Sequence, residues 1–245
     1  MATTVRVERV ATPDGEFDAH VVLPEAGSGP GIVVLQEIFG VGDYIKESAE
    51  RLAGLGYVAL APDLYWRIEP GIAIDHDEDG LGRAFEVSQK LDPELAVRDS
   101  IDALTTLRGL PEVSQDGGRA GVLGFCLGGT LAFHVAVQAD PDVAVCYYGS
   151  GIAGALEAVG DRITCPVLFH FGGQDPYIPR DQVDRVCDFA DSHANMECHV
   201  QEDAGHAFDN HAAPMFHQPE PAARAWEITR EFLARTLPVT APVPS

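Results

Sequence analysis

A cysteine between two glycines is the feature of this sequence with the clearest chemical potential. The run GFCLG at 124–128 follows an apolar stretch and precedes small, helix-forming residues. Glycines at both ends permit a sharp strand-to-helix turn, which exposes the central Cys126 as a nucleophile. Backbone N–H groups at the helix N-terminus would favour a thiolate and a developing oxyanion. The run alone is equally typical of a buried cysteine in the glycine-rich turn of a nucleotide-binding fold.

An aspartate and a histidine later in the chain complete a candidate catalytic set. Asp175 lies at a Gly-Gly turn after a buried apolar run, and His206 follows the last predicted strand. Nucleophile, acid and histidine occur in the order that α/β-hydrolase folds use. The thiolate would attack an acyl carbon, the histidine would carry the proton, and the aspartate would orient the imidazole. Each residue alone has an ordinary explanation, so the prediction depends on their order and placement.

Groups that could stabilise an oxyanion lie near the same strand ends. The backbone N–H of Leu127, directly after the nucleophile, and that of Ile38, after an early strand, are the candidates. Glu37 ends that early strand. A carboxylate there is usually solvated, whereas in a cleft beside Cys126 it and the thiol would perturb each other's ionisation. The residues alone leave both interpretations of Glu37 open.

Motifs for metals and nucleotides are weak. His211 and His217 lie near His206, but their spacing fits no common metal site. The acidic run at 75–79 lacks the ligand spacing and central glycine of an EF-hand loop. The glycine-rich turn has neither GxGxxG spacing nor a P-loop lysine. We therefore expect no cofactor and no metal.

Apolar and alternating runs predict a mostly parallel, doubly wound α/β sheet that begins with an antiparallel hairpin. Short continuous apolar runs are typical of strands buried on both faces. Their carboxyl ends would bring the candidate residues to one edge of the sheet. The hairpin is predicted at 5–10 and 16–23, and further strands at 31–37, 57–61, 120–125, 143–148, 165–171 and 195–200.

Helical stretches alternate with these strands, and no linker or repeat divides the chain. The pattern predicts one domain over 1–237 and a Pro-rich C-terminal tail over 238–245. The segment at 66–80 is expected to form a loop. Helices are predicted at 43–55, 81–91, 93–107, 130–138, 180–193 and 221–236.

The composition is strongly acidic. The 245 residues include 38 Asp and Glu against 16 Lys and Arg, which gives a net charge of −22. Such a surface repels nucleic acid and anionic membranes, so we expect neither as a partner, and no obligate protein partner is implied. No apolar run has the length of a membrane span, and the first residues lack a signal-peptide core. The expected location is the cytoplasm.

Five cysteines are spread over the second half of the chain, with no C-x-x-C pair. An odd number at wide spacing favours reduced thiols over a disulfide framework or a zinc site. All except Cys126 are expected to be small buried apolar residues: Cys146, Cys165, Cys187 and Cys198.

Five segments together resemble the dienelactone hydrolase family, the carboxymethylenebutenolidases. They are GFCLGG, QEIFG, APDLYWR, FGGQDPYIP and AGHAF. The resemblance extends from the first hairpin to the closing helix, and the cysteine combined with QEIFG and PDLY is its most specific part. It implies a cofactor-independent, cytoplasmic enzyme of the α/β-hydrolase fold that cleaves small esters or lactones in aromatic-compound degradation.

The resemblance also implies roles for individual residues. Cys126 would form a thioester acyl-enzyme. The family glutamate interacts with the resting thiol, and its displacement by substrate helps to generate a thiolate–imidazolium pair. The positions that match the family's nucleophile, acid, histidine, glutamate and two oxyanion-hole residues are Cys126, Asp175, His206, Glu37, Ile38 and Leu127.

Dienelactone is an anion, and the family holds its carboxylate with arginines and aromatic residues. Arg83 and Phe85, in the helix after PDLY, are the candidates here, and Phe39 is a further candidate for substrate contact. The segment AFDN after His206 contains no arginine, and Asp209 would disfavour a carboxylate if it faced the site. The sequence therefore predicts an incomplete anion-binding group.

Two alternatives remain open from the sequence. One is a general carboxylesterase or thioesterase for neutral substrates, which the incomplete anion-binding group suggests. The other is a redox role without catalysis, because exposed cysteines of low pKa also serve as peroxide sensors. The aspartate and histidine argue against a sensor, which needs neither residue.

Overall fold

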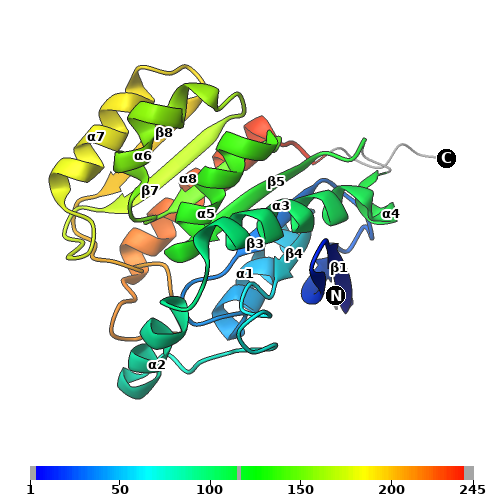
Figure 1. Cartoon of the computed structure of the whole chain (residues 1–245). Coiled ribbons are helices and arrows are strands. Elements are labelled where there is room, and N and C mark those ends of the chain that lie inside the picture. The colour runs from blue at the N-terminus through cyan, green and yellow to red at the C-terminus, as the bar shows by residue number, and fades with distance from the viewer. Residues whose placement is uncertain (1–3, 115–116, 240–245) are drawn as a thin grey trace.

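An eight-stranded, mostly parallel sheet forms the centre of the protein (Figure 1). The computed structural model describes residues 4–114 and 117–239. The strand order is β1-β2-β4-β3-β5-β6-β7-β8; β2 pairs antiparallel with β1 and β4, and the remaining pairs are parallel. The strands are β1 (Thr4–Thr12), β2 (Gly15–Leu23), β3 (Gly31–Leu35), β4 (Val58–Pro62), β5 (Ala120–Phe125), β6 (Ala144–Tyr147), β7 (Val167–Gly172) and β8 (Met196–Gln201).

Helices cover both faces of the sheet. Contacts join α3 to α5, α5 to α6 and α6 to α7 in one layer. On the other face, the guanidinium of Arg51 in α1 lies 3.9 Å from the ring centroid of Trp226 in α8. The helices are α1 (Asp43–Gly54), α2 (Glu78–Ser88), α3 (Pro93–Gly109), α4 (Pro111–Ser114), α5 (Leu127–Ala139), α6 (Ile152–Val159), α7 (Arg180–Asp191) and α8 (Pro219–Thr236), with a 3-10 turn at Gly160–Arg162.

The α/β-hydrolase fold class predicted from the sequence, including its antiparallel hairpin, is confirmed. β3, β4, β5, β6 and β7 are buried along their whole length, because helices cover both of their faces. None of the helices in the described residues is long and apolar enough to cross a membrane. The part of the predicted tail at 240–245 lies outside the described residues.

The helices differ from the expectation in their number and in some of their ends; α5, for example, begins at Leu127 and not at residue 130. The sequence predicted neither α4 nor α6; the glycines within and beside α6 lower its intrinsic helix propensity. α2 begins before residue 81 because Asp77 accepts a hydrogen bond from the backbone N–H of Gly80, at 2.7 Å, and so caps the helix. The loop expected at 66–80 is shortened accordingly.

The order of the strands reverses beside β3, whose neighbours are β4 on one side and β5 on the other. In open α/β sheets, such a reversal leaves a crevice beyond the carboxyl ends of the strands, where ligands bind. Glu37 and Ile38 follow β3, and Cys126 follows β5 directly. The topology therefore brings the predicted groups to the position in the sheet where a ligand is expected.

Backbone segments pack closely at the turn from β5 into α5. A Cβ on Gly124 would lie 2.0 Å from the carbonyl oxygen of Gly128, and one on Gly128 would lie 2.2 Å from that of Leu35. A Cβ on Gly129 would lie 2.4 Å from the carbonyl oxygen of Tyr147. Because the obstructing atoms belong to the backbone, they have little freedom to move away.

Replacing Gly124 by alanine is expected to destabilise the fold by about 3 kcal/mol or more, because the added methyl group overpacks this turn. In Gly82→Ala, by contrast, the methyl group meets no atom within 4 Å, and helix propensity is expected to raise stability by up to about 1 kcal/mol. Urea unfolding of both variants measures the difference. A Gly124→Ala protein as stable as the wild type would contradict the close packing.

The cysteines depart from the expectation of five reduced thiols. A disulfide joins Cys187 in α7 to Cys198 in β8, with their Cα atoms 5.0 Å apart. Cys126, Cys146 and Cys165 are free. The expectation was wrong for the pair because α7 packs directly on β8, and sequence spacing alone does not reveal that contact.

Removal of the disulfide in Cys187→Ser/Cys198→Ser is expected to cost about 2 kcal/mol, or about 5 °C in Tm, because it releases a short loop in the unfolded chain. A reducing agent should lower the Tm of the wild type and leave that of the double variant unchanged. Alkylation of the denatured, unreduced protein should label three thiols. Five labelled thiols would mean that the pair is reduced in the native protein.

Candidate active site

Cys126 stands at the turn between β5 and α5. Its backbone has a φ of 53°, in the left-handed region that residues with a side chain seldom adopt. Its N–H donates to the carbonyl oxygen of Tyr147 at 3.0 Å, and its own carbonyl accepts from the N–H of Thr130 at 3.2 Å. These bonds hold a strained residue in place at the N-terminus of α5, with its thiol half-buried.

His206 connects this thiol to Asp175. Nε2 of His206 lies 3.2 Å from Sγ of Cys126, and Nδ1 donates to Oδ2 of Asp175 at 2.7 Å. The other carboxylate oxygen of Asp175 accepts from the backbone N–H groups of Tyr177 and Ile178, at 2.8 and 3.2 Å. The structure therefore brings together the three residues predicted from chain order, although up to 80 positions separate them.

The contacts of His206 favour its protonated form. Burial lowers the pKa of His206, but its hydrogen bonds with Asp175 and Cys126 outweigh burial and raise the pKa to about 10. A protonated imidazole beside a thiol stabilises the thiolate. The arrangement can therefore hold an ion pair between sulfur and imidazole.

The structure places the two oxyanion-hole candidates from the sequence, Ile38 and Leu127, at one cavity. Cys126 lines this cavity as well. Leu127 is the first residue of α5, so its N–H has no acceptor within the helix. The hydroxyl of Tyr65 donates to the carbonyl oxygen of Ile38 at 2.9 Å and helps to fix that peptide.

Glu37 lines the same cavity with only 2% of its surface exposed. The side-chain amide of Asn210 donates to Oε2 at 2.5 Å, while Oε1 has no hydrogen-bond partner in the described structure. Burial raises the pKa of Glu37 to about 8, and the nearby His206 and the Asn210 bond only partly oppose this. Glu37 is therefore mainly a neutral acid at pH 7.

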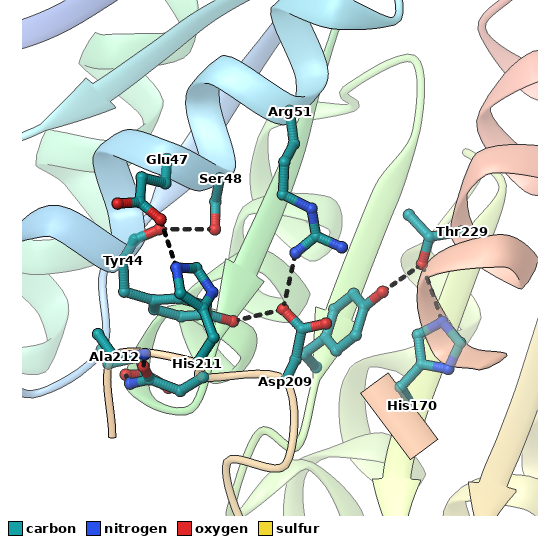
Figure 2. Close-up of polar contacts among 12 residues, drawn as sticks. Tyr44, Glu47, Ser48, Arg51, His170, Asp209, His211, Ala212 and Thr229 are labelled. Carbon is teal, nitrogen blue, oxygen red and sulfur yellow. Dashed lines mark hydrogen bonds and ion pairs between the residues drawn. The ribbon is translucent and has the colours of Figure 1, made fainter. Parts of the chain in front are cut away.

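Asp209 is buried behind the site and does not line the cavity. Figure 2 shows the Tyr44 hydroxyl and the Arg51 guanidinium pointing at its carboxylate, with distances of 2.8 and 3.2 Å to Oδ2. The same loop is fixed again by a hydrogen bond between His211 and Glu47 of α1. The acidic residue after the histidine thus anchors the loop that carries His206.

An apolar cavity of about 430 Å³ lies in front of the triad. Phe39 and Phe85, two of the predicted substrate contacts, line it. Arg83 does not line it; its side chain is 57% exposed and lies 3.8 Å from Glu69. Three of the other lining residues lie in α5 and follow Cys126 at helical spacing, which could have been recognised from the sequence. They are Thr130, Leu131 and His134. The sequence analysis also did not predict Leu81, Val97, Tyr177 and Phe216.

Comparison with known proteins identifies the family. The sequence model of the Dienelactone hydrolase family matches residues 17–237. The chain belongs to the dienelactone hydrolase family. It is a hydrolase of the dienelactone hydrolase type.

Relatives in this family cover nearly the full chain. A carboxymethylenebutenolidase of Pseudomonas putida is 37% identical over 219 residues, which is 89% of this chain and 91% of the relative. Carboxymethylenebutenolidase 1 of Cupriavidus pinatubonensis is 34% identical over 86% of this chain and 89% of its own length. The crystal structure of a dienelactone hydrolase-like promiscuous phosphotriesterase from metagenomic libraries has a TM-score of 0.76 at 25% identity, covering 96% and 99% of the two chains.

This dienelactone hydrolase family member contains no obvious metal centre in the part of the chain that the structure describes. Among those residues, no group of three or more His, Cys, Asp or Glu side chains is arranged to hold an ion. The polar side chains that line the cavity are instead those of Cys126, His206 and Glu37, together with Ser88, Thr130, His134, Ser150 and Tyr177.

Glu37 predicts a specific pH dependence of stability. Its carboxyl stays protonated in the folded protein up to about pH 8 but ionises near its ordinary value of 4.5 when unfolded. The folded state binds more protons in this window, so stability falls as the pH rises from about 4.5 to about 8. In Glu37→Gln this decline should be shallower by about 1 kcal/mol per pH unit.

Urea unfolding from pH 5 to pH 8 measures this slope. Glu25→Gln, at an exposed position, is the matched control and should follow the wild type. Parallel curves for the wild type and Glu37→Gln would mean that Glu37 is already ionised in the folded state.

Proposed function

We propose that this chain hydrolyses small carboxylic esters or lactones with Cys126 as nucleophile, His206 as proton carrier and Asp175 as the acid that orients it. The continuous hydrogen-bonded chain from Asp175 through His206 to Sγ of Cys126, at the end of an apolar cavity, carries this proposal. The names of the carboxymethylenebutenolidase relatives support the substrate class.

The first half of the proposed reaction forms a thioester. The thiolate of Cys126 attacks the acyl carbon, and the backbone N–H groups of Ile38 and Leu127 donate to the oxyanion. The carbonyl then re-forms and the bond to the alkoxide leaving group breaks. The alkoxide takes the Nε2 proton of His206 and leaves as an alcohol, or stays attached when the substrate is a lactone.

The second half consumes water. His206, now neutral, accepts a proton from a water molecule as it attacks the thioester carbon. The tetrahedral intermediate breaks its C–S bond, so the acid product leaves and the thiolate of Cys126 returns beside a protonated His206. Asp175 keeps the Nδ1 proton in place throughout and stabilises the imidazolium.

Glu37 supports this cycle best in its neutral form. An ionised carboxylate near the proposed thiolate would repel it. Asn210 holds Glu37 at Oε2, while Sγ of Cys126 contacts His206. The displacement of the glutamate, which the family resemblance implies, would break the Asn210 bond when substrate enters.

A dienelactone is the first candidate substrate because of the relatives' names. The second is an uncharged ester, and a specific observation favours it. Within the described residues, no lysine or arginine lines the cavity in front of Cys126. A neutral aryl ester should therefore be assayed beside a dienelactone.

Cys126→Ala is expected to lower kcat/KM by about a thousandfold or more on every substrate, because no other group forms the thioester. Asp175→Asn should retain the thiol but lose much of kcat, since it favours the wrong imidazole tautomer. Circular dichroism checks that both variants fold, and mass spectrometry of the quenched wild type should find an acyl group on Cys126. Hydrolysis by the Cys126→Ala variant at the wild-type rate would contradict this mechanism. Peroxide titration of Cys126 would then test the redox role.

A further inference from the structure

One wall of the cavity is a single face of α5. Leu127, Thr130, Leu131 and His134 all line it, at the spacing that places residues on one side of a helix. From Leu127 to His134 this face extends for about 10 Å, given a rise of 1.5 Å per residue. The cavity therefore continues well beyond the reacting sulfur.

The opposite wall comes from α2 and the start of α3. Leu81, Phe85 and Ser88 lie on one face of α2, and Pro93 and Val97 on one face of α3. In Figure 1, α2 lies apart from the sheet at one end of the molecule, so its inner face is free to form a wall. These walls can enclose an elongated apolar group between α2 and α5.

The groups that line this space carry little charge. Glu37, His134 and the Cys126–His206 pair are its ionisable members apart from Tyr177. Burial raises the pKa of Glu37 to about 8 and lowers the pKa of His134, so both are mainly neutral at pH 7. The thiolate and the imidazolium of the catalytic pair compensate each other.

Arg83 of α2 and Arg98 of α3 do not line the cavity. Arg83 is exposed and lies beside Glu69. Arg98 lines a separate hollow, which adjoins the cavity at Pro93, Val97 and His134, and it shares that hollow with Glu94. A carboxylate inside the cavity would thus lose its hydration without meeting a lysine or arginine, and the protonated His206 already has Asp175 and Cys126 as partners. Such burial is strongly unfavourable.

We infer that the substrate of this enzyme is an uncharged ester or lactone whose apolar group lies along α5 between Cys126 and His134, against the inner face of α2. This inference rests on the proposed function, because it uses Cys126 as the point of attack. The net charge of −22 acts in the same direction, since an acidic protein lowers the local concentration of anions and slows their association.

Two aryl esters that differ only at the end of the acyl chain test the charge preference: a butanoate and a hemisuccinate of the same phenol. The wild type should favour the butanoate in kcat/KM by a factor on the order of a hundred, because the hemisuccinate would bury an unpaired carboxylate. Ser88→Arg should raise kcat/KM for the hemisuccinate about tenfold by supplying a charged partner. Ser88→Met, of similar length and without charge, should not.

A series of linear esters tests where the apolar group lies. Values of kcat/KM should rise about fourfold per methylene, from 0.8 kcal/mol for each buried CH₂, until the chain reaches His134. In His134→Trp the rise should end at a shorter ester chain than in the wild type. In His134→Leu, whose side chain is not larger, the rise should end at the same chain length as in the wild type. Thermal unfolding of each variant confirms that the comparison is made on folded protein.

Equal or higher activity on the hemisuccinate in the wild type would overturn the inference. Loss of that activity in Arg83→Gln or Arg98→Gln would then identify the cation responsible. If kcat/KM stopped rising at the same chain length in His134→Trp as in the wild type, the placement along α5 would also be contradicted. The proposed function fails separately, if Cys126→Ala still hydrolyses the butanoate.

Discussion

The close approach of backbone segments at the start of α5 is the constraint on which the site depends. No Cβ fits at residues 124, 128 or 129, so β5 and α5 meet almost without a connecting loop. Cys126 must occupy the one position between them, with a φ of 53° that costs about 1 to 3 kcal/mol. As a result, Cys126 and Leu127 line the same cavity. The proposed nucleophile and one of the proposed oxyanion donors thus come from one strained turn.

The histidine reaches this point by a different means. It lies on a loop between β8 and α8, where Ala207 has a φ of 53°. The buried carboxylate of Asp209 ties the loop to Tyr44 and Arg51 of α1, and Arg51 stacks on Trp226 of α8. A buried carboxylate is tolerated when it is paired and hydrogen-bonded. Oδ2 of Asp209 has both kinds of partner, whereas Oδ1 has no hydrogen-bond partner among the described residues. The charge after the histidine therefore has a structural role.

How much of this could be predicted from sequence depends on the range of the contacts. The strands, the elbow and the order of the triad follow from local patterns, and the structure brings those residues together. The hydrogen bond between Asn210 and Glu37 could not be predicted from a local pattern, because 173 positions separate the two residues. The disulfide was missed for the same reason, since it depends on how α7 packs on β8. α6 was not predicted because the glycines within and beside it lower its helix propensity. Packing against α5 and α7 stabilises this helix, and the sequence does not show that packing.

Substrate charge and thiol activation are coupled through Glu37. Burial in the apolar surroundings of the cavity raises the pKa of this glutamic acid and keeps it mainly neutral close to the proposed nucleophile. A cavity arginine that bound a substrate carboxylate would stabilise the ionised form of Glu37 as well, at least until substrate arrived. It would then place a second negative charge near Cys126 and oppose the thiolate in the resting enzyme. An enzyme that uses uncharged esters avoids this conflict, because the same apolar surroundings serve both binding and the ionisation state of its nucleophile.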